Sequence, residues 1–147
     1  MKIIAHRGLM VGPNPEHENR PDTIDEALSH GFDVEADVWN ISGRLMLGHD
    51  KPQYDIEHWM FDTDKIWWHA KNVEALRPMI ERKCRVFYHT NEDVVMTSKQ
   101  ELWALPGKGF SGSYIVLPEN TNETIPSDAL GICTDYAIKY KEMYTWE

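Results

Sequence analysis

Cysteine and long hydrophobic runs are both scarce in this sequence. Its only cysteines, Cys84 and Cys133, lie far apart, which predicts buried thiols in a reducing compartment and no disulfide framework. No apolar run approaches the roughly 20 residues that a membrane span needs. The opening MKIIAHRG turns polar too early for the apolar core of a secretory leader. We therefore expect a cytoplasmic protein with no membrane span.

Positive charge is also in short supply. The chain has 15 Lys and Arg against 24 Asp and Glu, which gives a formal net charge of −9. Because nucleic acids and anionic membrane surfaces attract basic proteins, we expect neither of them as a partner. A small anionic ligand stays open, since local cations or a bound metal can reverse the field at one site. The sequence says nothing of the oligomeric state.

The pattern of apolar segments predicts one α/β domain over 1–147. The 147 residues, 41% of them hydrophobic, suffice for one real core. Strands are predicted at 2–5, 32–38, 66–70, 85–89, 101–105, 113–117 and 130–134. Helices are predicted at 23–29, 73–82 and 136–144, the first with Asp22 as N-cap and the second with Val73, Leu76 and Ile80 on its apolar face. Strands that alternate with such connections pair in parallel.

The segment DVEADV at 33–38 alternates acidic and apolar residues. Alternate side chains of a strand share a face, so Asp33, Glu35 and Asp37 would lie together. A surface strand with its acids in water is one interpretation. In a parallel sheet covered by helices, however, the acidic face must line a barrel interior or a cleft. Asp33 lies at the deeper end and is expected to be structural, bonded to backbone amides or to Arg or Lys.

Ionisable residues recur where the predicted strands end. The carboxyl ends of the strands in β/α barrels carry the active sites of those enzymes. Chance would place one such residue at a strand end, but not one at nearly every end. The residues are His6, Arg7, Glu35, Asp37, His69, Lys71, His89, Glu119 and Asp135.

Five short motifs, in order along the chain, resemble the glycerophosphodiester phosphodiesterase family, a metal-dependent branch of the phosphodiesterase β/α barrels. They are 4-IAHRG-8, 18-EN-19, 31-GFDVEADV-38, 48-GHD-50 and 131-GICTDYA-137. The resemblance implies a compact, reduced TIM-type β/α barrel with parallel strands and short helices. It also implies a phosphoric diester hydrolase that acts on a small glycerophosphodiester-like substrate.

Two departures from the family pattern bear on that expectation. The sequence 69-HAK-71 stands where the family has Glu-x-Lys, so His69 replaces a metal-binding Glu. The insertion that in the family follows His-Asp and helps to hold glycerol is missing after 48-GHD-50, which leaves the substrate open. The whole chain is also far below the about 250 residues typical of such a barrel.

By this resemblance, Glu35 and Asp37 hold one divalent cation. Adjacent carboxylates suit a hard ion, so Mg²⁺ or Ca²⁺ is expected, with Mn²⁺ as a further candidate. His69 is either a third ligand, which would favour a transition ion, or a hydrogen-bonded residue inside the barrel. By alternation, Trp67 shares the inward face with His69 and Trp68 faces the helices.

His6 and His49 are the expected general acid and base, although either could be a hydrogen-bonded structural histidine. Arg7 would clamp a phosphate oxygen or orient a carboxylate; an ion pair with Glu18 or Glu35 is the alternative. Lys71 would neutralise phosphate. Further candidates for the substrate side and the pocket are Asn19, Glu18, His89, Glu119 and Asp135.

Two functions of different class stay open. The first is hydrolysis of a phosphodiester. The second is a degenerate, non-catalytic barrel that binds a phosphorylated ligand or a metal, suggested by the lost insertion and by His69. Both candidate acid/base histidines remain in the sequence, which favours the enzyme.

Overall fold

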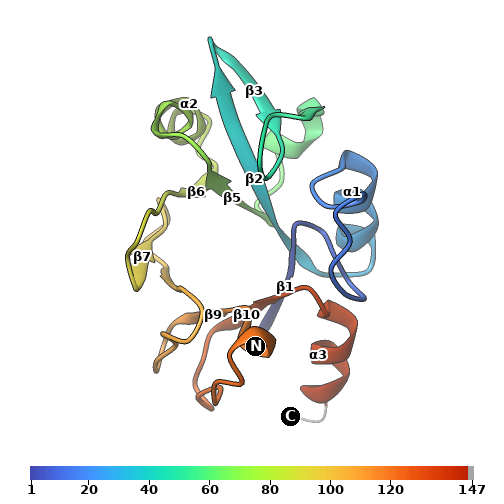
Figure 1. Ribbon diagram of the computed structural model, residues 1–147, viewed down its shortest axis with the longest axis vertical. Coiled ribbons are helices and arrows are strands. Elements are labelled where there is room, and N and C mark those ends of the chain that lie inside the picture. The colour runs from blue at the N-terminus through green and yellow to red at the C-terminus, as the bar shows by residue number, and fades with distance from the viewer. Residues whose placement is uncertain (146–147) are drawn as a thin grey trace.

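The protein is an α/β protein built on one curled, mixed sheet of ten strands. In the computed structural model, which describes residues 1–145, the sheet bends into a half-barrel with three short α-helices packed on its outside (Figure 1). No helix in that part of the chain is long and apolar enough to cross a membrane.

Seven parallel strands form the wall of the half-barrel, and they correspond to the seven predicted from sequence. Their order in the sheet is β6–β5–β2–β1–β10–β9–β8, with every neighbouring pair parallel. The strands are β1 (Lys2–His6), β2 (Asp33–Ile41), β5 (Ile66–Ala70), β6 (Arg85–Phe87), β8 (Leu102–Ala104), β9 (Tyr114–Val116) and β10 (Gly131–Thr134). Their carboxyl ends therefore meet at one rim.

Three further strands are antiparallel and were not predicted. β3 (Arg44–Leu47) and β4 (Tyr54–Asp55) extend β2 sideways, and β7 (Val94–Met96) pairs with β8. A two-residue turn joins β2 to β3, with both Ser42 and Gly43 at positive φ. Such a turn matches the twist of a hairpin. The Ser-Gly pair was therefore an available hairpin signal.

The prediction of a TIM-type barrel was wrong, because the two edges of this sheet do not join. Within residues 1–145 no ladder links β6 to β7 or β8. Ser98 bridges the two edges instead: its amide donates to the carbonyl of Val86 at 2.8 Å, and its Oγ accepts from the Val86 amide at 3.0 Å. The physical reason is that the chain is short. In the described residues only β7 and β8 lie between β6 and β9, without the helices that separate successive strands of a closed β/α barrel.

The helices lie near the predicted ranges, but two details of the prediction were wrong. The N-cap position of α1 (Pro21–Ser29) is Arg20, which makes no side-chain capping hydrogen bond, and Asp22 lies in the first turn of the helix. The segment 73–82 contains a 3₁₀ turn and then α2 (Leu76–Glu81), which buries Met79 and leaves Ile80 exposed; Val73, which was also predicted on the apolar face, is exposed in the 3₁₀ turn. The tighter 3₁₀ turn rotates the helix relative to a uniform 3.6-residue period.

The last helix and three short turns complete the fold. α3 (Ala137–Met143) matches the prediction for 136–144 and packs against β1 and β10. The 3₁₀ turns are η1 (His58–Phe61), η2 (Val73–Ala75) and η3 (Pro118–Asn120). The two cysteines are free and buried, as expected.

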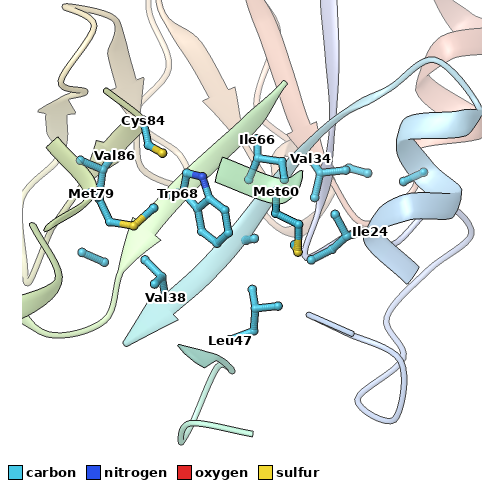
Figure 2. Packing of buried hydrophobic residues seen from close by; sticks show 14 of the residues in the cluster. Ile24, Val34, Val38, Leu47, Met60, Ile66, Trp68, Met79, Cys84 and Val86 are labelled. Atoms are coloured by element: carbon cyan, nitrogen blue, oxygen red, sulfur yellow. The ribbon is translucent and has the colours of Figure 1, made fainter. Parts of the chain in front are cut away.

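The sheet separates two hydrophobic clusters, one on each face. The outer cluster lies between the sheet and the segments that cover it; Val34, Val38 and Trp68 meet Ile24 of α1 and Met79 of α2 there (Figure 2). Because strand side chains alternate, the acids of β2 must then point to the inner face.

The inner cluster lines the concave side of the sheet. Trp67 is buried in it and stacks against Trp103 at 5.5 Å between ring centroids, so Trp67 and Trp68 face opposite ways, as predicted. Asp33 is bonded to the Trp67 indole N–H at 2.9 Å and to Lys2 at 3.0 Å. These contacts confirm a structural role for that acid and hold it below the rim.

Candidate active site

One cavity of about 200 Å³ opens at the rim where the parallel strands end. One side of it is polar and belongs to the first half of the chain: His6, Arg7, Glu35, His49, His69, Lys71 and His89. The other side is apolar: Phe87, Trp103, Leu105, Pro106, Val116 and Leu117. The structure thus brings both expected acid/base histidines, both expected phosphate-binding cations and the metal candidates Glu35 and His69 to one place.

A larger hollow of about 440 Å³ lies at the opposite end of β1, between Lys2, Phe32 and Lys141. It contains no histidine, and its one acid, Asp33, is already bonded. We therefore place the candidate site in the smaller cavity.

Glu35, Asp37 and His69 form a compact group of potential metal ligands. One donor atom from each lies within 4.8 Å of the other two. Parallel pairing sets Asp37 opposite His69 in neighbouring strands, and Glu35 lies two residues earlier on the same face. Both carboxylates are buried, with exposed fractions of 3% and 1%.

The donors in this group suit a divalent cation. Oxygen Oε1 of Glu35 is buried with no hydrogen-bond partner, an arrangement that costs free energy unless a cation lies nearby. Burial, and then the neighbouring charge of Asp37, raises the pKa of Glu35. The Nδ1–H of His69 donates to Asp37 at 2.9 Å, which leaves Nε2 as a lone-pair donor. Two carboxylates and one imidazole accept Mn²⁺, Co²⁺ or Zn²⁺ as well as harder ions.

Asp37 is held in place by a set of contacts from the segment after β1. The side-chain amide of Asn19 donates to Asp37 Oδ2 at 2.8 Å, and its Oδ1 accepts from the Asp37 backbone N–H at 2.9 Å. Arg7 Nε lies 3.4 Å from Asp37 Oδ2. Burial opposes ionisation of Asp37, but the hydrogen bond and charge of His69, then Asn19 and Arg7, lower its pKa to about 2. Asn19 therefore orients the candidate ligand Asp37, and its expected contact with a metal-bound water or a ligand hydroxyl stays a prediction.

His6 is fixed by an acid from the far end of the chain. Its Nδ1–H donates to Asp135 at 2.7 Å, and its Nε2 lies 3.5 Å from Glu35. Burial lowers the pKa of His6, but the charge of Glu35 and the hydrogen bond to Asp135 outweigh it, so the pKa is raised. Glu119 in turn accepts from the Asp135 backbone N–H at 3.1 Å and from the hydroxyl of Thr134. The expected pocket residues Asp135 and Glu119 are not among the residues that line the cavity; Asp135 contacts His6, and Glu119 contacts Asp135.

His49 lies at the edge of the cavity, about a third exposed at its side chain. The preceding Gly48 has φ 153°, and a Cβ there would lie 1.9 Å from the carbonyl oxygen of Lys51. Its own carbonyl accepts from the indole N–H of Trp39 at 2.7 Å. Burial, followed by the charge of Arg7, lowers the pKa of His49. A turn that only glycine can adopt therefore sets the position of a histidine that is mostly neutral at neutral pH.

Arg7 sits in the left-handed region, with φ 56°, directly after β1. Its Nη1 donates to Glu18 at 3.0 Å and its Nε lies 3.4 Å from Asp37, so Arg7 forms the alternative ion pair with Glu18 and also contacts a carboxylate of the site. Glu18 thus contacts Arg7, and it does not line the cavity. Arg7 does line the cavity beside Lys71, which leaves a cationic edge for an anion.

His89 stacks on His69 with 4.3 Å between the ring centroids, and Phe87 stacks against His69 at 5.2 Å and against His89 at 6.2 Å. Burial, and then the charges of His69 and Lys71, lower the pKa of His89 to about 4. The expected pocket residue His89 is therefore a neutral wall of the cavity that fixes the plane of His69.

Comparisons with models of protein families, with curated proteins and with solved structures found no match to this chain. Fold and site together define an α/β protein with a candidate acidic metal-binding group at a rim of histidines.

Proposed function

We propose that this protein is a metal-dependent phosphodiester hydrolase that acts on a glycerophosphodiester-like substrate by histidine acid–base catalysis. The observation that carries the proposal is the meeting of His6, His49, Arg7 and Lys71 beside Glu35 in one cavity. On this proposal the curled sheet is a reduced form of the β/α barrel that the sequence motifs resemble.

The two histidines have pKa values displaced in opposite directions, which suits them to opposite roles. Neutral His49 takes the proton of a substrate hydroxyl next to the phosphate. That oxygen forms a bond to phosphorus while the bond to the leaving alkoxide breaks. Protonated His6 gives its proton to the alkoxide. Water then opens the cyclic phosphate with the two roles reversed.

The remaining polar residues bind and orient the substrate. Arg7 and Lys71 face the phosphate oxygens from one edge of the cavity. Glu35, Asp37 and His69 would hold a divalent cation, which would supply positive charge against the phosphate. Asp135 keeps the Nδ1 proton of His6 in place, so that Nε2 faces the cavity side beside Glu35.

The test is turnover of glycerophosphocholine with and without a chelator. We expect hydrolysis that stops with the chelator and returns with added Mn²⁺ or Mg²⁺. His6→Ala and His49→Ala should each lower kcat by about 10²–10⁴-fold. His30→Ala, at an exposed histidine outside the cavity, is the matched control.

Metal binding is tested separately with the double variant Glu35→Gln, Asp37→Asn. Calorimetry should show loss of Mn²⁺ binding in a protein that still melts cooperatively. If wild type binds phosphodiesters and metal but turns over none of them, the non-catalytic binding module is correct and the proposal is wrong.

A further inference from the structure

The cavity has two chemically different halves, and only the polar half is used by the proposed reaction. The apolar wall, formed by Phe87, Trp103, Leu105, Pro106, Val116 and Leu117, comes from β6, β8, β9 and the residues that follow β8 and β9. Apart from the indole N–H of Trp103, no side chain in it carries a hydrogen-bond donor or acceptor.

Leu117 belongs to this wall because the backbone leaves the strand pattern. Tyr114 and Val116 point inward from β9, and simple alternation would turn Leu117 to the outside. Instead Leu117 has φ 48°, in the left-handed region that leucine rarely adopts, and it packs against the inner cluster and lines the cavity. Such strain persists only where the surroundings fix it, and it gathers at ligand sites.

The opposite side of the wall is also held by the backbone. The amide of Leu105 donates to Asp93 at 2.9 Å, and the Leu105 carbonyl accepts from Lys108 at 2.9 Å. Glu123 binds the next turn through the amides of Gly107 and Gly109. The wall is therefore a preformed surface, and a ligand pays little ordering entropy to contact it.

We infer that the substrate is a phosphodiester in which one of the two ester groups is a hydrocarbon or aromatic group. This inference rests on the proposed function, because it assumes that the phosphate lies against Arg7 and Lys71. A substituent on that phosphate must then extend over the apolar wall, which offers a polyol almost no polar partner. The cavity, at about 200 Å³, takes a compact group or the first carbons of a longer chain.

The experiment compares four phosphodiesters that share a glycerol ester and differ in the second alcohol: methanol, n-butanol, n-octanol and glycerol. Binding is measured by calorimetry with Mn²⁺ present, and release of glycerol phosphate is followed in the same samples. Partial burial of three added methylenes predicts that the butyl ester binds about tenfold more tightly than the methyl ester. The glycerol ester should bind no better than the methyl ester. A further gain with octyl identifies a lipid chain as the source of the group, and a plateau identifies a compact alcohol; either supports the inference.

Leu117→Asn is the decisive variant, because asparagine tolerates the left-handed backbone and removes the apolar surface. The butyl-to-methyl affinity ratio should fall toward one. Leu105→Asn is the second variant if Leu117→Asn does not fold. Leu130→Asn, at a half-exposed leucine outside the cavity, should keep the wild-type ratio.

Equal binding of the butyl, methyl and glycerol esters, or a ratio unchanged in both cavity variants, would overturn the inference. In that case continued hydrolysis that a chelator abolishes leaves the proposed function intact. Tighter binding of the butyl ester without any hydrolysis would support an apolar group on the ligand and contradict the proposed enzymatic function. Absence of binding to all four esters overturns both.

Discussion

At the scale of single residues, the candidate site depends on acids that control histidines. Asp135 holds His6, and Asp37 holds His69. In both pairs the carboxylate fixes the tautomer by accepting from Nδ1–H, which turns Nε2 toward the cavity side. His6 and His69 both donate to an aspartate, but only His6 has its Nε2 within 3.5 Å of Glu35, so the surroundings of the two rings differ.

Asp135→Asn should change the pH dependence of the reaction. The hydrogen bond to Asp135 helps to raise the pKa of His6, so its removal lowers that pKa. His6 must be protonated to release the alkoxide, and the alkaline limb of the kcat profile should consequently move to lower pH. The acid limb, set by His49, should stay in place. Rate profiles of wild type, Asp135→Asn and the exposed control Asp25→Asn test this, and an unmoved alkaline limb would contradict it.

His69→Glu should shift the metal preference toward hard cations. The ligand group gains a negative charge and loses a nitrogen donor, which favours Mg²⁺ or Ca²⁺ over Co²⁺ or Zn²⁺. We expect the ratio of the Mg²⁺ and Co²⁺ dissociation constants to change at least about tenfold, or about 1.4 kcal/mol. Calorimetry and the Co²⁺ absorption spectrum measure it. The same ranking in both folded proteins would show that His69 is not a ligand.

At the scale of elements, the β2–β3 hairpin positions both the buried acids and His49. Its first strand carries the buried acids, and its second leads through Gly48 to His49. Leu47 is fully buried in the outer cluster, and the Gly48 amide donates to the Asp37 carbonyl at 3.2 Å. The histidine is therefore positioned by a segment that packs on both the core and the strand that carries Glu35 and Asp37.

Gly48→Ala should damage this segment more than a comparable change nearby. Its Cβ would overlap the Lys51 carbonyl, whereas a Cβ at Gly43 meets no atom within 4 Å and adds only backbone strain at φ 90°. We expect Gly48→Ala to lower the free energy of unfolding by about 2–3 kcal/mol and Gly43→Ala by about 1 kcal/mol. Urea unfolding of both variants measures the difference. Equal losses would mean that the turn relaxes freely around the new methyl group.

At the scale of the whole molecule, the shifted pKa values of buried acids make the free energy of unfolding depend on pH. Asp37, with a pKa lowered to about 2, contributes stability that is present above its ordinary value of 3.8 and is lost as the pH falls toward 2. Glu35 has the opposite sign: its raised pKa means that the metal-free protein loses stability as the pH rises and the buried carboxyl ionises. A cation bound to Glu35 would offset that cost.

Mn²⁺ should accordingly raise the Tm, and the rise should shrink as the pH falls through the raised pKa of Glu35, because protons compete for the ligand. At a free concentration of 100 times the Kd, we expect a rise of about 5–10 °C near neutral pH. Glu35→Gln should abolish the rise, and Glu57→Gln, at an exposed glutamate, should keep it. A rise of constant size down to acid pH would exclude Glu35 from the metal site.

The sequence by itself determined the features that depend on local order along the chain. Period-two alternation was enough to place the seven parallel strands, to set Glu35 and Asp37 on one face, and to turn Trp67 and Trp68 to opposite sides. The rim residues could be predicted because parallel strands bring their carboxyl ends together, whatever the residues in between.

Tertiary structure decided the features that depend on partners distant in sequence. His6 meets Asp135 across 129 positions, and the strained Leu117 joins an apolar wall that no local pattern reveals. The sequence likewise did not predict that the sheet edge stays open and is bridged by Ser98. Nor did it predict the rotation of α2 that buries Met79 in place of Ile80. Alternation fixes which face a side chain takes, but the contact it makes there is set by how far the sheet curls and by which segments the chain is long enough to bring against it.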